Sequence, residues 1–87
     1  MTREHIVRTW LRFLHVEQYS DSFIENGYDD METVKLIDIE DLEAIGVRRH
    51  DHKRYLLDNV KMLRENGAAW VYLVTASQAN TDQEDNR

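Results

Sequence analysis

Residues 38–47 read DIEDLEAIGV and carry the start and stop signals of one short helix. The carboxylate of Asp38 can accept the free amide protons of the first turn, and Asp41 stands at the third helical position of a box-like capping arrangement. Gly46 follows Ile45, and glycine is common just past a helix end because it adopts left-handed backbone angles without strain. The stretch therefore predicts a helix that starts after Asp38 and ends before Gly46.

A longer helix is predicted on the C-terminal side of this stretch, over about residues 49–66. Leu56, Val60 and Leu63 recur at the three- and four-residue spacing that places apolar side chains on one helix face. Gly67 follows as the natural terminator. This element should be the longest in the chain and should pack its apolar face on the core.

Three further helices are predicted on the N-terminal side, over residues 4–14, 17–26 and 31–36. The first has four apolar residues at i, i+3, i+4 and i+7, namely Val7, Trp10, Leu11 and Leu14. Gly27 should end the second helix, and Asp30 is placed to cap the third. The pattern as a whole predicts an all-α fold of five helices, and its aromatic residues are most simply core residues.

Composition restricts the class of protein. The 87 residues suffice for one domain, expected over residues 1–67, and the modest core they can bury argues against a deep catalytic cleft. There is no cysteine, so a disulfide framework and a thiolate metal site are excluded. The absence of proline favours helices joined by short turns. With no secretory signal evident, we expect a cytoplasmic domain.

The C-terminal tail, residues 68–87, changes character twice. Residues 68–74 read AAWVYLV, which is far shorter than the roughly 20 apolar residues needed to cross a bilayer. This apolar part could pack back on the domain, continue the last helix, or be a fragment of a larger protein. The polar run over residues 77–87 is expected to be disordered.

Charge is divided along the chain. Ten acidic side chains stand against one lysine between residues 17 and 45: Glu17, Asp21, Glu25, Asp29, Asp30, Glu32, Asp38, Glu40, Asp41 and Glu43, with Lys35 opposed. Between residues 46 and 64 the sign reverses, with Arg48, Arg49, Lys53, Arg54, Lys61 and Arg64 against Asp51 and Asp58. Complementary potentials of this kind steer protein association and fix its register. The division favours docking onto copies or relatives of the same domain.

With the helices placed, the sequence resembles a SAM (sterile alpha motif) domain across about residues 5–66. The residues that carry the resemblance are Val7-x-x-Trp10-Leu11, Tyr19-x-x-x-Phe23, Asn26-Gly27-Tyr28, Met31-x-x-Val34, Glu40-Asp41-Leu42-x-x-Ile45-Gly46-Val47 and His52-Lys53-Arg54-x-Leu56-Leu57. Among subfamilies the chain is most similar to the SAM domains of Eph receptors and of the adaptors and inositol phosphatase that pair with them. The resemblance implies a five-helix bundle with a long C-terminal helix.

The resemblance also implies a protein–protein interaction module in receptor or adaptor signalling, in which two surfaces bind other SAM domains. The mid-loop face would comprise Tyr28, Asp29, Asp30, Glu32, Asp38, Glu40 and Asp41. The end-helix face would comprise Gly46, Val47, Arg48, Arg49, Lys53, Arg54 and Leu57. The start of the last helix offers free amide protons, and its arginines are forked donors suited to carboxylates. Asp51 departs from the glycine or alanine of many members and lowers the positive potential there.

Several alternatives remain beside heterotypic SAM binding. Use of both faces would give a homopolymerising scaffold, and the acidic run could be a solvated surface only. The basic start of the last helix could instead grip an RNA stem-loop, although the neighbouring acids would repel phosphate.

Metal binding and catalysis find less support in the sequence. His50 and His52 point to different sides of a helix and lack an evident third ligand. Nothing in the sequence points to a catalytic group or to a cofactor. We therefore expect a non-enzymatic domain without a metal or cofactor.

Overall fold

The computed structural model describes residues 5–75 and is all-helical over them, which confirms the predicted fold class. The elements are α1 (Ile6–Phe13), the 3₁₀ helix η1 (Glu17–Tyr19), α2 (Ser20–Glu25), α3 (Met31–Val34), α4 (Ile39–Ile45) and α5 (His50–Asn66), and residues 68–75 are also helical. Among these residues no helix is both long enough and apolar enough to cross a bilayer.

Two predicted helices are shorter or tighter than expected. The helix predicted over residues 17–26 begins with the 3₁₀ helix η1, in which the amide of Tyr19 donates to the carbonyl of Val16 three residues earlier. The helix predicted over residues 31–36 ends early because the amides of Leu36 and Ile37 also bond three residues back. Such bonds tighten a helix end and turn the chain sooner than α-helical bonds do.

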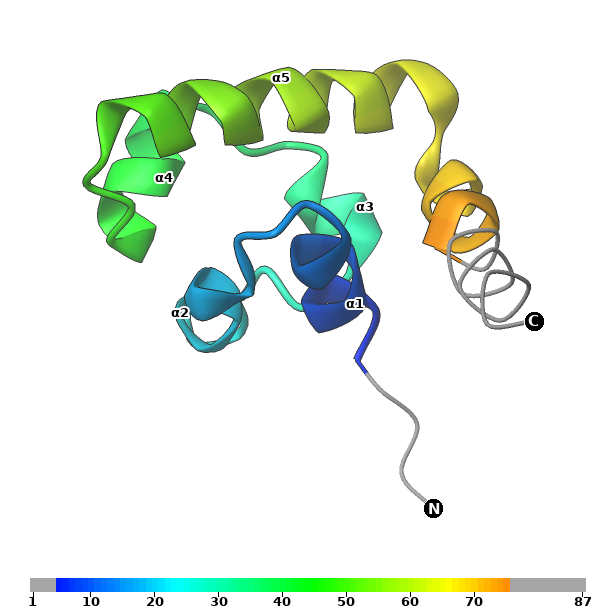
Figure 1. Ribbon diagram of the computed structural model, residues 1–87, viewed down its shortest axis with the longest axis horizontal. Coiled ribbons are helices and arrows are strands. Elements are labelled where there is room, and N and C mark those ends of the chain that lie inside the picture. The colour runs from blue at the N-terminus through cyan, green and yellow to red at the C-terminus, as the bar shows by residue number, and fades with distance from the viewer. Residues whose placement is uncertain (1–4, 76–87) are drawn as a thin grey trace, which may run out of the picture.

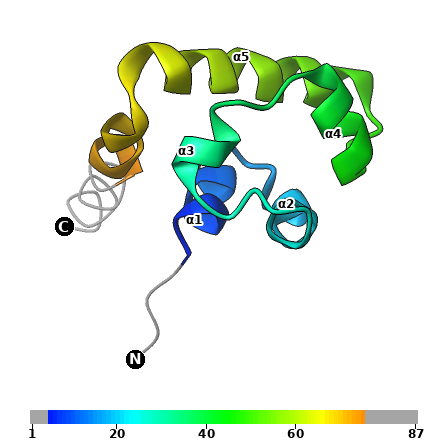
Figure 2. The ribbon, with the colours of Figure 1, turned by 180° about the vertical axis from the view of Figure 1, so that it is seen from behind.

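The long helix α5 lies across the other elements (Figure 1). In both views α4 sits beneath the first part of α5, and α1, α2 and α3 lie on the same side of it (Figures 1 and 2). The apolar face predicted for α5 is the face that meets them, since Leu56, Val60 and Leu63 are each 0% exposed. The turn that leads from α4 into α5 therefore lies at one corner of the domain.

The core is built from the residues that the sequence pattern indicated. Trp10 of α1 and Phe23 of α2 are 1% and 0% exposed and join the same buried cluster as the apolar face of α5. The Tyr55 hydroxyl of α5 donates a hydrogen bond of 2.8 Å to the carbonyl of Leu14, just after α1. The first and last of the predicted five helices are therefore tied directly to each other.

Helix α4 has both of its predicted terminal signals. Asp38 and Asp41 form a capping box, in which Asp38 accepts the amide protons of the first turn and Asp41 accepts the amide proton of Asp38. At the other end Gly46 takes a left-handed conformation with φ of 109°, and the amide of Val47 bonds to the carbonyl of Leu42 at 3.0 Å. This is the Schellman arrangement, and it directs the chain into α5.

Helices α2 and α1 end in the same way. Gly27 follows α2 with φ of 94°, and the amide of Tyr28 bonds to the carbonyl of Phe23 at 2.9 Å. The rings of these two residues meet edge to face, which supplies the apolar contact that usually accompanies this motif. After α1 the left-handed position is held by His15, with φ of 67°, and not by glycine.

Residues 68–75 fold back on the core, the first of the three placements that the sequence left open for residues 68–74. Gly67 turns the chain with φ of 86° and ψ of 158°, a conformation essentially restricted to glycine. Val71, beyond the expected limit of the domain at residue 67, is 0% exposed within the core cluster, and Ala68 and Trp70 pack against it. The predicted disorder of residues 77–87 lies outside the described residues.

Candidate interaction surfaces

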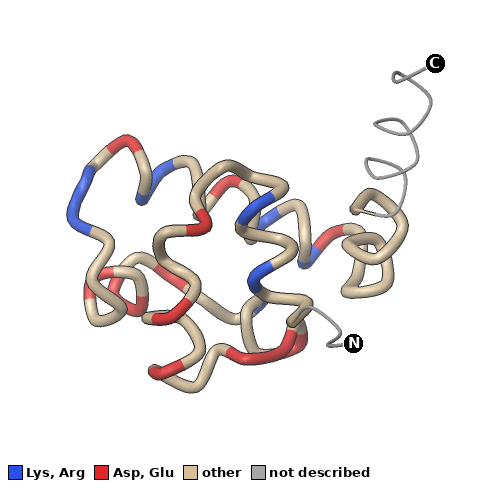
Figure 3. Tube along the Cα trace, turned by 60° about the horizontal axis from the view of Figure 1, so that its bottom comes forward, with Lys and Arg blue, Asp and Glu red and all other residues tan. Residues whose placement is uncertain are grey.

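The residues expected on the end-helix face lie together at the corner between α4 and α5. Arg48, Arg49 and Arg54 are exposed there, whereas Lys53 and Leu57 are partly buried. Val47 is 1% exposed as a whole residue, so it belongs to the core and does not contribute to this surface as the sequence predicted. In Figure 3 the basic segment at this corner stands beside acidic segments of the preceding elements.

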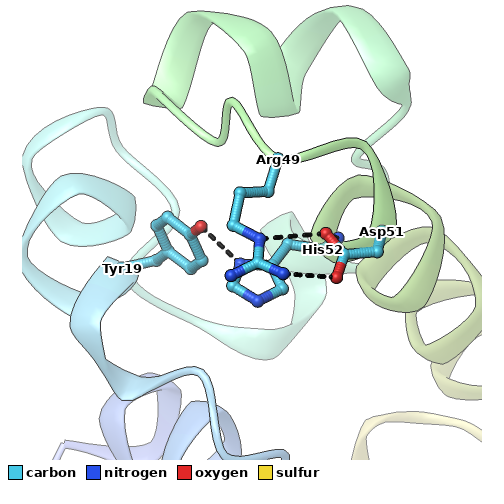
Figure 4. Close-up of polar contacts among 4 residues, drawn as sticks. All are labelled: Tyr19, Arg49, Asp51 and His52. Atoms are coloured by element: carbon cyan, nitrogen blue, oxygen red, sulfur yellow. Dashed lines mark hydrogen bonds and ion pairs between the residues drawn. The ribbon is translucent and has the colours of Figure 1, made fainter.

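Arg49 is held in a two-point ion pair by Asp51. Its Nη2 donates to Oδ2 of Asp51 at 2.8 Å and its Nε donates to Oδ1 at 3.1 Å (Figure 4). The same Oδ1 accepts the backbone amide proton of His52 at 3.0 Å. Hydrogen bonding to Arg49 is the largest influence that lowers the pKa of the Asp51 carboxyl, and the pairing raises the pKa of Arg49 in turn.

The other basic residues of the face differ in what they contact. Lys53 donates to Glu43 at 3.2 Å and its side chain is only 17% exposed, so this pair joins α5 to α4. Arg48 and Arg54 form no hydrogen bond or ion pair with any residue in the described part of the chain. These two guanidinium groups are the ones presented to solvent without a competing partner from residues 5–75.

The residues expected on the mid-loop face are brought together by α3, α4 and the loop before α3. Partial burial is the largest influence that raises the pKa of the Tyr28 hydroxyl, followed by hydrogen bonding to Asp41 and by the charges of Asp41 and Asp38. Asp30 caps α3 by accepting the amide proton of Thr33 at 2.8 Å, the bond that chiefly lowers the pKa of Asp30. Asp30, Asp38 and Asp41 of this face therefore all cap the start of a helix.

The remaining acids of the mid-loop face are differently placed. Glu32 pairs with Lys35 one turn along at 2.6 Å. Asp29 and Glu40 are exposed and make no hydrogen bond or ion pair through their side chains with residues 5–75. Only these two carboxylates of the predicted set are uncommitted within the described chain.

Two exposed apolar residues accompany this face and were not anticipated. Leu36 is 68% exposed and Ile39 is 42% exposed, and they flank the Ile37-Asp38 pair at the start of α4. The sequence indicated this exposure, since Leu36, Ile37 and Ile39 are too close together along the chain for all three side chains to reach one face of the core. Their exposure adds aliphatic side chains to a surface for which the sequence predicted six acids and Tyr28.

The charge division in the sequence is partly cancelled in three dimensions. Four acids of the run pair with basic residues: Asp21 with Arg8, Glu17 with Arg12, Glu32 with Lys35 and Glu43 with Lys53. The charge count over residues 17–45 does not show this because three of the four bases lie outside that range, two of them in α1 and Lys53 in α5. Exposed pairs of this kind contribute little stability, but they reduce the charge available to a partner.

A polar contact lies beside the end-helix face, between Tyr19 and His52. The Tyr19 hydroxyl is hydrogen-bonded to Nδ1 of His52 at 2.6 Å, and the two rings meet edge to face (Figure 4). The sequence predicted the aromatic residues in the core, and Tyr19 packs against the core while partly exposed. The contact itself could not be anticipated because 33 residues separate the two partners. Within residues 5–75 no group of three potential ligands converges as a metal site would require.

Comparison with known proteins agrees with this geometry. The family model described as SAM domain (sterile alpha motif) matches residues 1–64. Human phosphatidylinositol 3,4,5-trisphosphate 5-phosphatase 2 is 43% identical over 53 residues, which are 61% of this chain and 4% of the phosphatase. Ephrin type-B receptor 4b of Danio rerio is 35% identical over 66 residues, which are 76% of this chain and 7% of the receptor. The chain thus spans a small fraction of these relatives.

Proposed function

Because the chain belongs to the sterile alpha motif (SAM) family, we propose that it binds the SAM domain of another protein in receptor or adaptor signalling. In this proposal the end-helix face of the chain meets the acidic mid-loop face of its partner. SAM domains are non-catalytic modules that bind other SAM domains. The receptor and the phosphatase among the relatives support a signalling role, and the lack of cysteine suits a cytoplasmic setting.

The observation that carries the proposal is the exposure of Arg48 and Arg54 at the corner before and within α5. Neither guanidinium is bound by a residue of the described chain, and an arginine can engage a carboxylate through two parallel hydrogen bonds. Leu57, partly buried beside them, can supply apolar contact. A partner surface rich in carboxylates fits this arrangement.

A heterotypic partner is favoured over a second copy of the chain. Most acids of the chain's own mid-loop face cap a helix or pair with lysine, which leaves Asp29 and Glu40 as uncommitted carboxylates among residues 5–75. A protein partner is also favoured over RNA, because Glu43 and Asp51 lie within the basic corner and would repel phosphate.

The proposal is tested by calorimetric titration of the chain into the SAM regions of the two relatives described above. We expect Arg48→Gln and Arg54→Gln each to weaken binding by about three- to tenfold, with the loss shrinking as salt is raised. Lys61→Gln is the matched control, since Lys61 is an exposed cation of α5 without a partner in the described chain. It should leave affinity unchanged.

Two outcomes would count against the proposal. If Arg48→Gln and Lys61→Gln weaken binding equally, net charge and not the end-helix face governs association. If the wild-type chain binds neither SAM region but light scattering shows growth beyond dimers at low salt, the chain is a homopolymerising scaffold.

A further inference from the structure

Asp51 occupies the position that a partner's carboxylate would take on Arg49. Its two oxygens engage Nε and Nη2 of the guanidinium, which is the two-point geometry by which arginine recognises a carboxylate from another molecule (Figure 4). A partner carboxylate cannot use that edge of Arg49 while Asp51 is bound to it.

The pair is held in place by the local backbone. Arg49 is the residue that precedes α5, with an extended backbone, and Asp51 lies in the first turn of the helix. Oδ1 of Asp51 also accepts the amide proton of His52, so the carboxylate is oriented before any partner arrives. Both side chains remain more than half exposed, at 67% for Arg49 and 64% for Asp51, so a partner can still reach the pair from solvent.

We infer that Asp51 is an internal competitor for Arg49 and thereby sets which acidic partners the end-helix face accepts. The inference rests on the proposed function and extends it from the face to its selectivity. Arg48 and Arg54 are available to any carboxylate, whereas Arg49 is released only when a partner offers a better ligand than Asp51. Asp51 is thus a positioning residue that acts through Arg49 and need not touch the partner itself.

The competition favours partners with closely spaced carboxylates. A single exposed carboxylate gains little by replacing Asp51, because one ion pair is broken for each one formed. A surface with several adjacent carboxylates can bind Arg48 and Arg54 first and then displace Asp51 at high local concentration. Loss of the Asp51 charge should therefore strengthen binding most for sparsely acidic partners.

The experiment compares Asp51→Asn with Asp58→Asn. Asparagine at residue 51 can still accept the His52 amide proton. Asp58 is an exposed acid elsewhere on α5. Each substitution removes one negative charge, so the two variants have the same net charge. Two probes are titrated by calorimetry: a sparsely acidic peptide, in which two aspartates are separated by glycines, and the SAM regions of the two relatives. Asp51→Asn should bind the peptide about two- to fivefold tighter than Asp58→Asn does. On an Arg49→Gln background the gain should disappear.

The outcomes separate the inference from the proposed function. If the SAM regions bind the wild-type chain and Asp51→Asn is no tighter than Asp58→Asn on either probe, competition by Asp51 is refuted and the function stands. If no SAM region binds but Asp51→Asn gains affinity for the peptide through Arg49, competition stands and the partner class is wrong. If neither the wild-type chain nor Asp51→Asn binds either probe, both are refuted.

Discussion

The hydrogen bond between Tyr19 and His52 is the most consequential single contact at the residue scale. It joins η1 to the first turn of α5 and lies next to the end-helix face (Figure 4). Both residues are only partly exposed, so water cannot fully replace a lost partner. The contact should therefore help to fix the start of α5, from which Arg49 and Asp51 project.

We expect Tyr19→Phe to lower the free energy of unfolding by about 1 kcal/mol, because His52 loses a part-buried hydrogen bond while the ring and its packing are kept. Urea denaturation followed by circular dichroism measures the change. Tyr72→Phe is the control, since Tyr72 is 54% exposed and its hydroxyl has no partner among the described residues. Equal stability of Tyr19→Phe and the wild-type chain would show that the hydrogen bond is replaced by water at no cost.

Residue-scale features were predictable where they are local in sequence. The capping box of Asp38 and Asp41 spans three residues, so its chemistry can be recognised in the sequence. The pair of Lys53 with Glu43 spans ten residues and depends on how α4 and α5 cross. The sequence therefore assigned charge correctly to segments but could not show which charges neutralise one another.

At the scale of elements, α1, α2 and α4 of the described chain end in the same Schellman arrangement, and α1 lacks the glycine that the other two have. The amide of Val16 bonds to the carbonyl of Leu11 at 2.8 Å and the amide of His15 bonds to that of Arg12 at 2.9 Å. His15 must hold a left-handed backbone for these bonds to form. That conformation is costly for residues with a Cβ atom, although asparagine tolerates it well.

We expect His15→Asn to raise the free energy of unfolding by about 0.5 kcal/mol and His15→Val to lower it by about 1 kcal/mol. The side chain is exposed, so the difference should come from the backbone conformation and not from packing. Thermal and urea denaturation of the two variants provide the measurement. If valine and asparagine give the same stability, the left-handed conformation at residue 15 carries no strain.

The elements themselves were largely predictable, because each carries its own start or stop signal. Asp30, Asp38, Gly27 and Gly46 mark helix ends in the sequence and take those roles in the structure. The tight turn of η1 was not anticipated because nothing in residues 17–19 distinguishes a 3₁₀ helix from an α-helix. The end after α1 was also less clear, since residues other than glycine are uncommon at a left-handed position, although histidine is one of those that take it more often.

For the whole molecule, the helical segment after Gly67 completes the core. Val71 is fully buried, although the family match ends at residue 64. Placement of residues 68–74 was left open by the sequence because burial of a short apolar run depends on whether the rest of the domain exposes a matching surface. We propose that the folding unit extends through this segment.

We expect Val71→Ala to lower the free energy of unfolding by about 2 kcal/mol, since two buried methyl groups are removed from the core. Leu73→Ala, at a position 68% exposed in the same segment, should change it little. Chemical denaturation of both variants provides the comparison. If Val71→Ala changes the stability as little as Leu73→Ala, burial of this segment adds nothing to the stability of the domain.

The packing of α1 against α5, which is far from it along the chain, also determines when the domain can fold during its own synthesis. α1 leaves the ribosome before α5, whose apolar face packs in the same core, and Val71 follows later still. Chains emerge at roughly 5–20 residues per second, so the part of α1 that packs on α5 stays uncovered for several seconds. During that interval this part of α1 is accessible to chaperones and to other nascent chains.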